Sequence, residues 1–207
     1  ARIHAVEELL DVAIQARHYS VVAPGLLKPV KHAGGVPIAS TALELHHPKG
    51  VIGVISPWNY PLTLAVGDAI PALLAGNGVV LKPDLQTTLS ALWLVDLLYE
   101  AGLPEGLFGV VAGEGGVVGP MITERGDFIM FTGSTGVGRQ VAARCGERLV
   151  GCSMELGGKN AMIVCDDANI RKAAEIAQRS SFANAGQPCI SMERLYVHRS
   201  VAAEFTT

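Results

Sequence analysis

The sequence predicts an α/β fold in which a parallel sheet carries helices on both of its faces. From residue 51 onwards, short apolar segments typical of buried strands alternate with longer segments of helical periodicity. Hydrophobic residues make up 49% of the 207-residue chain and charged residues 17%, which provides enough apolar surface for a sizeable core. Glycine is frequent, at 24 residues without a fixed period, as turns and close backbone approaches in such a fold require.

The elements follow in chain order from apolar spacing and turn residues. Residues 1–20 predict an amphipathic helix with apolar side chains three and four apart, and a loop rich in Pro and Gly follows up to residue 37. Residues 38–46 predict a strand and residues 48–50 a turn. Strands are then expected at residues 51–56, 79–82, 108–111 and 128–132. Helices are expected between and after them, at residues 62–74, 89–100, 119–123 and 136–145.

A second α/β unit is predicted to begin after Glu155. Its first expected strand spans residues 161–165, and the two aspartates at 166–167 are expected to cap a helix over 170–183. Another strand begins at residue 195. Since roughly fifty residues are too few to close a sheet of their own, this unit is expected to be cut off or to borrow structure from a partner.

Composition argues against several classes of function. The net charge is −3 without a basic block, and aromatic residues are only 5% of the chain, so nucleic-acid binding has no support. The most apolar stretch, residues 66–81, is interrupted by Asp, Pro, Asn and Gly, and residues 1–20 lack the apolar core of a signal peptide. The four cysteines contain no CxxC pair, which favours neither a disulfide framework nor a metal site. We therefore expect a cytoplasmic protein without membrane association.

Residues 133–138 form a glycine-rich turn between a predicted strand and a predicted helix. The free backbone N–H groups and positive dipole end of such a helix suit a phosphate group. The spacing is G-x-x-G-x-G, which differs from the usual G-x-G-x-x-G dinucleotide pattern. A tight turn without a ligand is an equally good interpretation of the glycines alone.

Four further residues have side chains suited to catalysis or binding. Cys189 follows a predicted helix and is a nucleophile if its pKa is lowered, whereas the other cysteines lie in apolar stretches that favour core packing. Glu155 lies among apolar residues and glycines, which favours either a general base or a capping carboxylate. Asn59 suits an oxyanion-binding amide or a turn residue, and Lys82 a ligand contact at a strand end or a solvated cation.

Taken in order, five segments resemble the aldehyde dehydrogenase superfamily. These segments are ISPWNYP, LKP, FTGSTGVG, MELGGKN and NAGQPC, and the similarity runs over about residues 50–198. Residues 57–83 and 186–197 are most similar to succinate-semialdehyde dehydrogenases, although lactaldehyde and non-phosphorylating glyceraldehyde-3-phosphate enzymes share similar segments. The resemblance implies a Rossmann-like cofactor domain over residues 1–156, with an oligomerisation-type strand segment near 36–48. It also implies the beginning of a catalytic domain over 157–207.

The resemblance also implies roles for individual residues. Cys189 would attack the aldehyde carbonyl, and the Asn59 amide with the Cys189 backbone N–H would bind the resulting oxyanion. Glu155 would activate the water that hydrolyses the thioester. NAD(P) would contact Ser56, Trp58, Lys82, Gly133, Ser134, Leu156 and Gly157, and no metal is implied.

Two positions depart from the pattern of the family. Many members that use NAD carry Glu three residues after the cofactor lysine, where this chain has Leu85. Because that carboxylate would repel a 2′-phosphate, its absence favours NADP over NAD. Some semialdehyde dehydrogenases carry a second Cys two residues after the nucleophile, where this chain has Ser191, so no local disulfide switch is expected.

Members of the family are much longer, and the segment EIFGP that holds the nicotinamide ribose has no counterpart here. The chain is therefore expected to be a fragment, inactive alone, of an enzyme that acts on a small-molecule aldehyde as a homodimer or homotetramer. Three alternatives remain: a CoA-acylating relative, which Glu155 argues against; a non-catalytic cofactor-binding relative; and a cofactor-free cysteine hydrolase. The last alternative requires a His partner for the thiol, for which His198 is the nearby candidate in sequence.

Overall fold

The computed structural model describes residues 2–36 and 38–206, which form two compact units. The first unit runs from Arg2 to Glu155, and the second runs from Leu156 to the end of the described chain. Within the described residues, no helix combines the length and the apolar character needed to cross a membrane.

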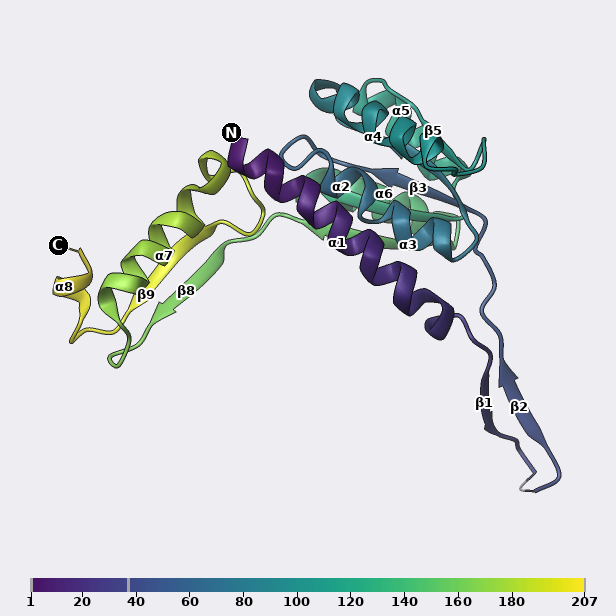
Figure 1. The fold of residues 1–207 in the computed structure, drawn as a ribbon, viewed down its shortest axis with the longest axis horizontal. Helices are drawn as coiled ribbons and strands as arrows, with labels where there is room; N and C mark the ends of the chain where they lie inside the picture. Colours follow the sequence, from purple (N-terminus) through teal and green to yellow (C-terminus); the bar gives the residue numbers. More distant parts are fainter. Residues whose placement is uncertain (1, 37, 207) are drawn as a thin grey trace. The chain divides into compact units, whose positions relative to one another are not determined.

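The first unit is built on a five-stranded sheet whose strand order is β5-β4-β3-β6-β7. Two of these strands, β3 and β5, are labelled in Figure 1. The strands are β3 (Val51–Ile55), β4 (Gly78–Lys82), β5 (Phe108–Val110), β6 (Phe128–Gly133) and β7 (Gly151–Leu156). β3 pairs in parallel with both β4 and β6, and β4 pairs in parallel with β5. The predicted α/β fold with a parallel sheet is therefore confirmed.

Helices cover both faces of this sheet, because successive crossovers in opposite directions along the sheet place their helices on opposite sides. The helices of this unit are α1 (Arg2–Leu26), α2 (Thr63–Val66), α3 (Ala69–Leu74), α4 (Thr88–Glu100), α5 (Gly115–Arg125) and α6 (Thr135–Glu147), with a short 3₁₀ helix η1 (Leu85–Thr87). α2, α3 and α4 share one core with β3, β4 and β5, and α1 packs over α2 and α3. α5 packs on β3 and β4, and α6 on β6.

The alternation along β3 explains the two covered faces. Ile52 and Val54 belong to the core beneath α2 and α4. Gly53 points the opposite way, where a Cβ atom would overlap the Ile122 side chain of α5. A glycine at this position therefore lets α5 lie close to the sheet.

The structure corrects several predicted elements of the first unit. α1 extends to Leu26, beyond the predicted end at residue 20, and its predicted apolar stripe is largely exposed, whereas Glu8 is buried. The single predicted helix over 62–74 is two helices, α2 and α3. The predicted loop contains β1 (Val30–Ala33), which pairs with β2 (Thr41–Glu44) in an exposed antiparallel hairpin. Of the predicted strand at 38–46, only β2 forms, and Pro37 lies outside the described residues.

The second unit contains a parallel pair of strands and a helix that packs on it. Its elements are β8 (Asn160–Val164), α7 (Ile170–Phe182), a 3₁₀ helix η2 (Ala183–Gly186), β9 (Met192–Val197) and α8 (Ala202–Thr206). Val164, Ile170 and Ala173 form a small core. The predicted cap at residues 166–167 is wrong, because the side chain of Asn169 accepts the N–H of Lys172 (3.0 Å) and caps α7.

Candidate functional site

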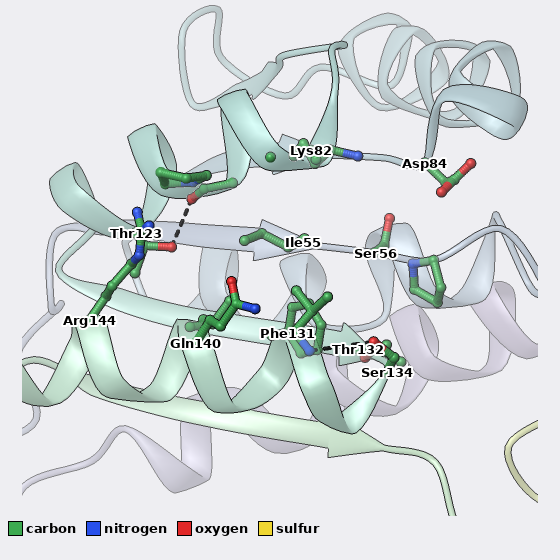
Figure 2. A pocket seen from close by; sticks show the side chains of 18 of the residues that line it. Ile55, Ser56, Lys82, Asp84, Thr123, Phe131, Thr132, Ser134, Gln140 and Arg144 are labelled. Atoms are coloured by element: carbon green, nitrogen blue, oxygen red, sulfur yellow. Dashed lines mark hydrogen bonds between the residues drawn. The ribbon is translucent and has the colours of Figure 1, made fainter.

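A cavity of about 470 Å³ lies at the carboxyl ends of β3, β4 and β6 (Figure 2). The chain passes from β3 to β4 and β5 and then returns to β6 on the other side of β3. At such a reversal the two neighbouring crossovers leave in opposite directions, which opens a crevice beyond the strand ends. Its volume lies in the range of pockets that hold small molecules and cofactors.

Two buried polar side chains face the cavity from adjacent strands. Lys82 ends β4 with 5% of its surface exposed, and its ammonium group donates to the carbonyl oxygen of Pro83 (2.8 Å). Ser56 directly follows β3 and is 4% exposed, and its hydroxyl finds no hydrogen-bond partner among the described residues. A buried hydroxyl in this state is costly unless a ligand or water satisfies it, which makes Ser56 a candidate for ligand contact.

The first turn of α6 borders the same cavity. Ser134 is the N-cap, and its hydroxyl accepts the N–H of Val137 at 3.5 Å. Gly133 precedes it, where a Cβ atom would come within 2.7 Å of the Phe131 ring. Backbone N–H groups and the positive dipole end of α6 therefore point toward the cavity, as an anionic diphosphate requires.

α5 and α6 form the remaining walls of the cavity and supply residues that the sequence analysis did not single out. Gln140 and Arg144 point into the cavity from α6 in Figure 2, opposite Thr123 on α5. The hydroxyl of Thr123 is satisfied internally by the carbonyl oxygen of Gly119 (2.7 Å). In the sequence, the indication that Gln140 and Arg144 lie on the same face of a helix is their spacing of four residues, which is about one helical turn.

The structure gathers five of the seven predicted cofactor residues around this cavity: Ser56, Trp58, Lys82, Gly133 and Ser134. Leu156 and Gly157 do not line it, since Leu156 ends β7 and Gly157 is an exposed residue that follows. Leu85 lies in η1, is 46% exposed and is also absent from the cavity wall.

Asn59 lies in the segment between β3 and α2, and this segment is anchored by a residue far away in sequence. The carboxylate of Glu8 accepts the N–H groups of Leu62 (2.8 Å) and Thr63 (3.2 Å) at the start of α2. Glu8 lies on the buried side of α1 with 8% exposure. Burial raises its pKa above the ordinary value, although the two N–H donors partly oppose this rise. In the sequence, the indication of this anchoring role is that Glu8 lies among the predicted apolar residues of the first helix.

Glu155 lies on β7 and is exposed. Its negative charge acts on Asp68, at the junction of α2 and α3, whose pKa is raised first by burial and then by Glu155. Two carboxyl groups that influence each other favour retention of a proton on one of them. Asp68 is therefore an acidic neighbour of Glu155 that the sequence analysis missed.

Cys189 lies in the second unit, where its side chain is exposed. Its backbone carbonyl oxygen accepts a hydrogen bond from the Asn160 amide (2.6 Å). Of the cysteines expected in the core, Cys145 is buried and Cys152 half-buried, but Cys165 is exposed, so core packing is wrong for Cys165. Burial raises the pKa of the Cys145 thiol to about 11, which makes it a poor nucleophile.

The chain is similar to known proteins along its whole length. A relative from Mycolicibacterium smegmatis, named "Putative succinate-semialdehyde dehydrogenase" with NADP(+) given in its name, is 56% identical over 206 residues. The alignment covers 100% of this chain and 40% of the relative, so the chain spans about two fifths of that protein's length.

Two solved structures are similar in both fold and sequence. The NADP-dependent glyceraldehyde-3-phosphate dehydrogenase of Bacillus halodurans C-125, complexed with NADP, has a TM-score of 0.89 and 36% identity, with 98% of this chain and 43% of that chain covered. The aldehyde dehydrogenase of Mycobacterium tuberculosis, complexed with NAD+, has a TM-score of 0.86 and 37% identity, with 93% and 40% covered. Residues 5–207 match the sequence profile of the aldehyde dehydrogenase family. This chain belongs to the aldehyde dehydrogenase family.

Proposed function

We propose that this chain supplies the cofactor cavity and the nucleophile of an NADP-dependent enzyme that oxidises succinate semialdehyde to the carboxylic acid. The observation that carries the cofactor part is the cavity itself, where a buried cation, an unsatisfied buried hydroxyl and a helix N-terminus meet at the reversal of strand order. The name of the Mycolicibacterium smegmatis relative supports succinate semialdehyde as the substrate and NADP as the cofactor.

The residues present fit a dinucleotide. The N–H groups at the start of α6 suit the diphosphate, and Lys82 and Ser56 suit the ribose hydroxyls or a 2′-phosphate at the ends of β4 and β3. When bound, NADP supplies the acceptor for the hydride that leaves the substrate carbon. Asp84 also lines the cavity, but its carboxylate already accepts the N–H of Gln86 (3.0 Å).

In the proposed mechanism the Cys189 thiolate adds to the aldehyde carbon and forms a thiohemiacetal. The side-chain amide of Asn59 and the backbone N–H of Cys189 hold the negative oxygen. Loss of hydride leaves a thioester on the sulfur, and Glu155 takes a proton from the water that attacks it. The products are the carboxylic acid and the free thiol, so the cysteine is regenerated. Removal of one oxyanion donor is expected to slow the reaction roughly 100-fold or more.

The proposal also covers the oligomeric state and the cellular compartment of the protein. The β1–β2 hairpin exposes every residue of both strands, which suits contact between copies of the natural protein in a homodimer or homotetramer. A free thiol nucleophile also favours a reducing compartment such as the cytoplasm.

The test is NADPH formation by the natural gene product with succinate semialdehyde and a panel of other aldehydes. Activity that depends on NADP and disappears in Cys189→Ala supports the proposal. Acyl-CoA formation in the presence of CoA would favour the acylating branch, and turnover without nucleotide would favour a cysteine hydrolase. Absence of activity with every aldehyde would overturn the assignment of an enzyme.

Cofactor preference has its own test at position 85. Leu85→Glu introduces a carboxylate three residues after Lys82, and we expect it to weaken NADP binding at least about tenfold more than NAD binding, because only NADP carries the 2′-phosphate. Leu89→Glu is the matched control, since Leu89 is an 81% exposed residue of α4 that lies seven residues after Lys82. Calorimetric titration with both nucleotides measures the effect, and an equal loss for NAD and NADP would contradict the preference.

A further inference from the structure

The turn that carries Cys189 is defined at both of its ends. The N–H of Ser191 donates to the carbonyl oxygen of Pro188 (3.1 Å), which closes a β-turn with Cys189 at its second position. Pro188 and Ser191 are buried, whereas Cys189 is exposed between them. The fold therefore fixes the base of the turn and presents the thiol.

The backbone that leads into this turn is strained. Asn184 and Ala185 have φ values of 44° and 58°, in the left-handed region that favours glycine, and Gly186 has φ 76°. A left-handed conformation at a residue with a Cβ atom costs about 1 kcal/mol or more, so the surrounding contacts must hold the segment in place.

One side chain from another element holds the turn that follows the strained residues. The amide nitrogen of Asn160, at the start of β8, donates to the carbonyl oxygens of both Cys189 (2.6 Å) and Ser191 (3.0 Å). The nitrogen has two hydrogens, so both bonds can form at once. The strand register shifts between Asn160 and Ala161, and this irregularity lies at the residue that makes the two bonds.

We propose that Asn160 is a positioning residue for Cys189: its amide holds the carbonyl group of Cys189, in the peptide after the nucleophile, and thereby orients the thiol. This inference rests on the proposed function, in which that thiol attacks the aldehyde. With Pro188 buried on one side and the Cys189 carbonyl held on the other, both peptide planes next to the Cys189 Cα atom are fixed. The direction of the Cα–Cβ bond follows from these two planes.

The chemistry of the amide makes the role specific to asparagine. Asn160→Ala removes both donors and leaves the two carbonyl oxygens without this partner. Asn160→Asp keeps the shape but sets a carboxylate against two carbonyl oxygens, which repels both. Protonation of that carboxyl at low pH restores one O–H donor, so the aspartate variant can be partly rescued by acid.

Asn169 provides a matched control in the same unit. Its side chain caps α7 by accepting the N–H of Lys172 (3.0 Å), at the opposite end of that helix from the segment that leads to Cys189. Asn169→Ala therefore removes a structural hydrogen bond of an asparagine from the second unit without touching the nucleophile segment.

The first measurement is amide hydrogen exchange of the peptide that spans residues 186–192. We expect Asn160→Asp to speed exchange in this peptide at least about tenfold, while Asn169→Ala speeds exchange at the start of α7 and leaves residues 186–192 unchanged. Equal exchange of the 186–192 peptide in wild type and Asn160→Asp would overturn the proposal, because the Asn160 amide would then not stabilise the Cys189 turn.

The second measurement is steady-state kinetics of the natural gene product. Relative to Asn169→Ala, we expect Asn160→Asp to lower kcat at least about tenfold with KM for the aldehyde within about threefold, because misplaced groups lose rate rather than ground-state binding. The ratio of the variant rate to the wild-type rate is expected to rise as the pH is lowered. A kcat equal to that of Asn169→Ala, or a ratio independent of pH, would overturn the inference. If instead Cys189→Ala retains activity, the proposed nucleophile itself is wrong.

Discussion

At the scale of single residues, buried polar groups hold the loops at both ends of the parallel strands of the first unit. Burying a polar group is costly unless it is hydrogen-bonded. Asn77 meets this requirement, because its side-chain oxygen accepts the N–H groups of Lys49 (2.6 Å) and Gly50 (3.1 Å). Glu8 meets it at the start of α2, whereas Ser56 in the cavity wall does not. The satisfied groups are structural anchors, and the unsatisfied hydroxyl remains available to a ligand.

Replacement of Glu8 tests the anchor beneath Asn59. Glu8→Ala leaves the N–H groups of Leu62 and Thr63 without their acceptor, and we expect the free energy of unfolding to fall by about 1–3 kcal/mol. Glu8→Gln keeps an acceptor and is expected to lose less. Urea unfolding measures both, with Glu7→Ala as control because Glu7 is exposed on the same helix. A loss for Glu7→Ala as large as that for Glu8→Ala would contradict the anchoring role.

The same carboxyl predicts a pH dependence. Because its pKa is raised in the folded protein, its contribution to stability is full below the ordinary carboxyl pKa and is lost as pH rises through the folded value. Glu8→Gln, which does not titrate, is expected to flatten this part of the stability profile. A variant profile parallel to that of the wild type in this window would show that Glu8 does not titrate there.

The candidate catalytic residues were predictable because they lie in segments whose order along the chain is itself informative. Glu8, Asp68 and Asn160 were not assigned, although each contacts or influences the surroundings of one of those residues. Their partners lie between 29 and 87 residues away, and such contacts exist only once the chain is folded. The order of these segments therefore identifies candidate catalytic residues, but it does not predict which residues hold them.

At the scale of elements, the N-terminus of α6 combines a structural and a ligand role. Ser134→Ala removes the cap and is expected to cost about 1 kcal/mol of stability. Ser134→Asp keeps a capping oxygen but adds a negative charge next to the proposed diphosphate. We expect Ser134→Asp to retain stability and to weaken nucleotide binding at least about tenfold. Thermal unfolding and calorimetric titration separate the two effects, and unchanged binding in Ser134→Asp would show that the diphosphate lies elsewhere.

The close packing of α5 on the sheet gives a second prediction at this scale. In Gly53→Ala the new methyl group meets Ile122 and the Ile129 side chain, and we expect a loss of about 1–3 kcal/mol. Gly109→Ala is the matched control, because the corresponding Cβ atom on β5 meets nothing within 4 Å. Denaturant unfolding compares the two, and equal stability of both variants would show that α5 shifts away without cost.

The elements that the sequence did not predict share a physical cause. β7 lies at the edge of the sheet, where its exposed and half-exposed residues give neither a continuous apolar run nor a clear alternation. β1 is exposed at every position and has no buried face to produce a pattern, whereas β2 lies within the strand predicted at residues 38–46. The central strands β3 and β4 were predicted because burial on both faces selects a continuous run of apolar residues.

At the scale of the whole molecule, the cavity and the proposed nucleophile belong to different compact units. A ligand that binds only the folded form of one unit stabilises that unit by an amount set by its concentration relative to Kd, about 2.7 kcal/mol at 100 times Kd. The residues that line the described cavity all lie within 2–155, so the predicted stabilisation by a nucleotide applies to the first unit.

The position of the cavity within the first unit predicts that NADP raises the unfolding midpoint of this unit. Both tryptophans of the chain, Trp58 and Trp93, lie in the first unit, so tryptophan fluorescence follows that unit alone. Hydrogen exchange of β8 and β9 follows the second unit. Trp58→Phe is the fluorescence control, because it removes the tryptophan that lines the cavity and leaves Trp93 to report unfolding. Lys82→Met is expected to reduce the NADP-induced shift, because it removes the buried cation. A shift of equal size in β8 and β9 would mean that the two units unfold together, and the nucleophile segment would then be stabilised by the cofactor.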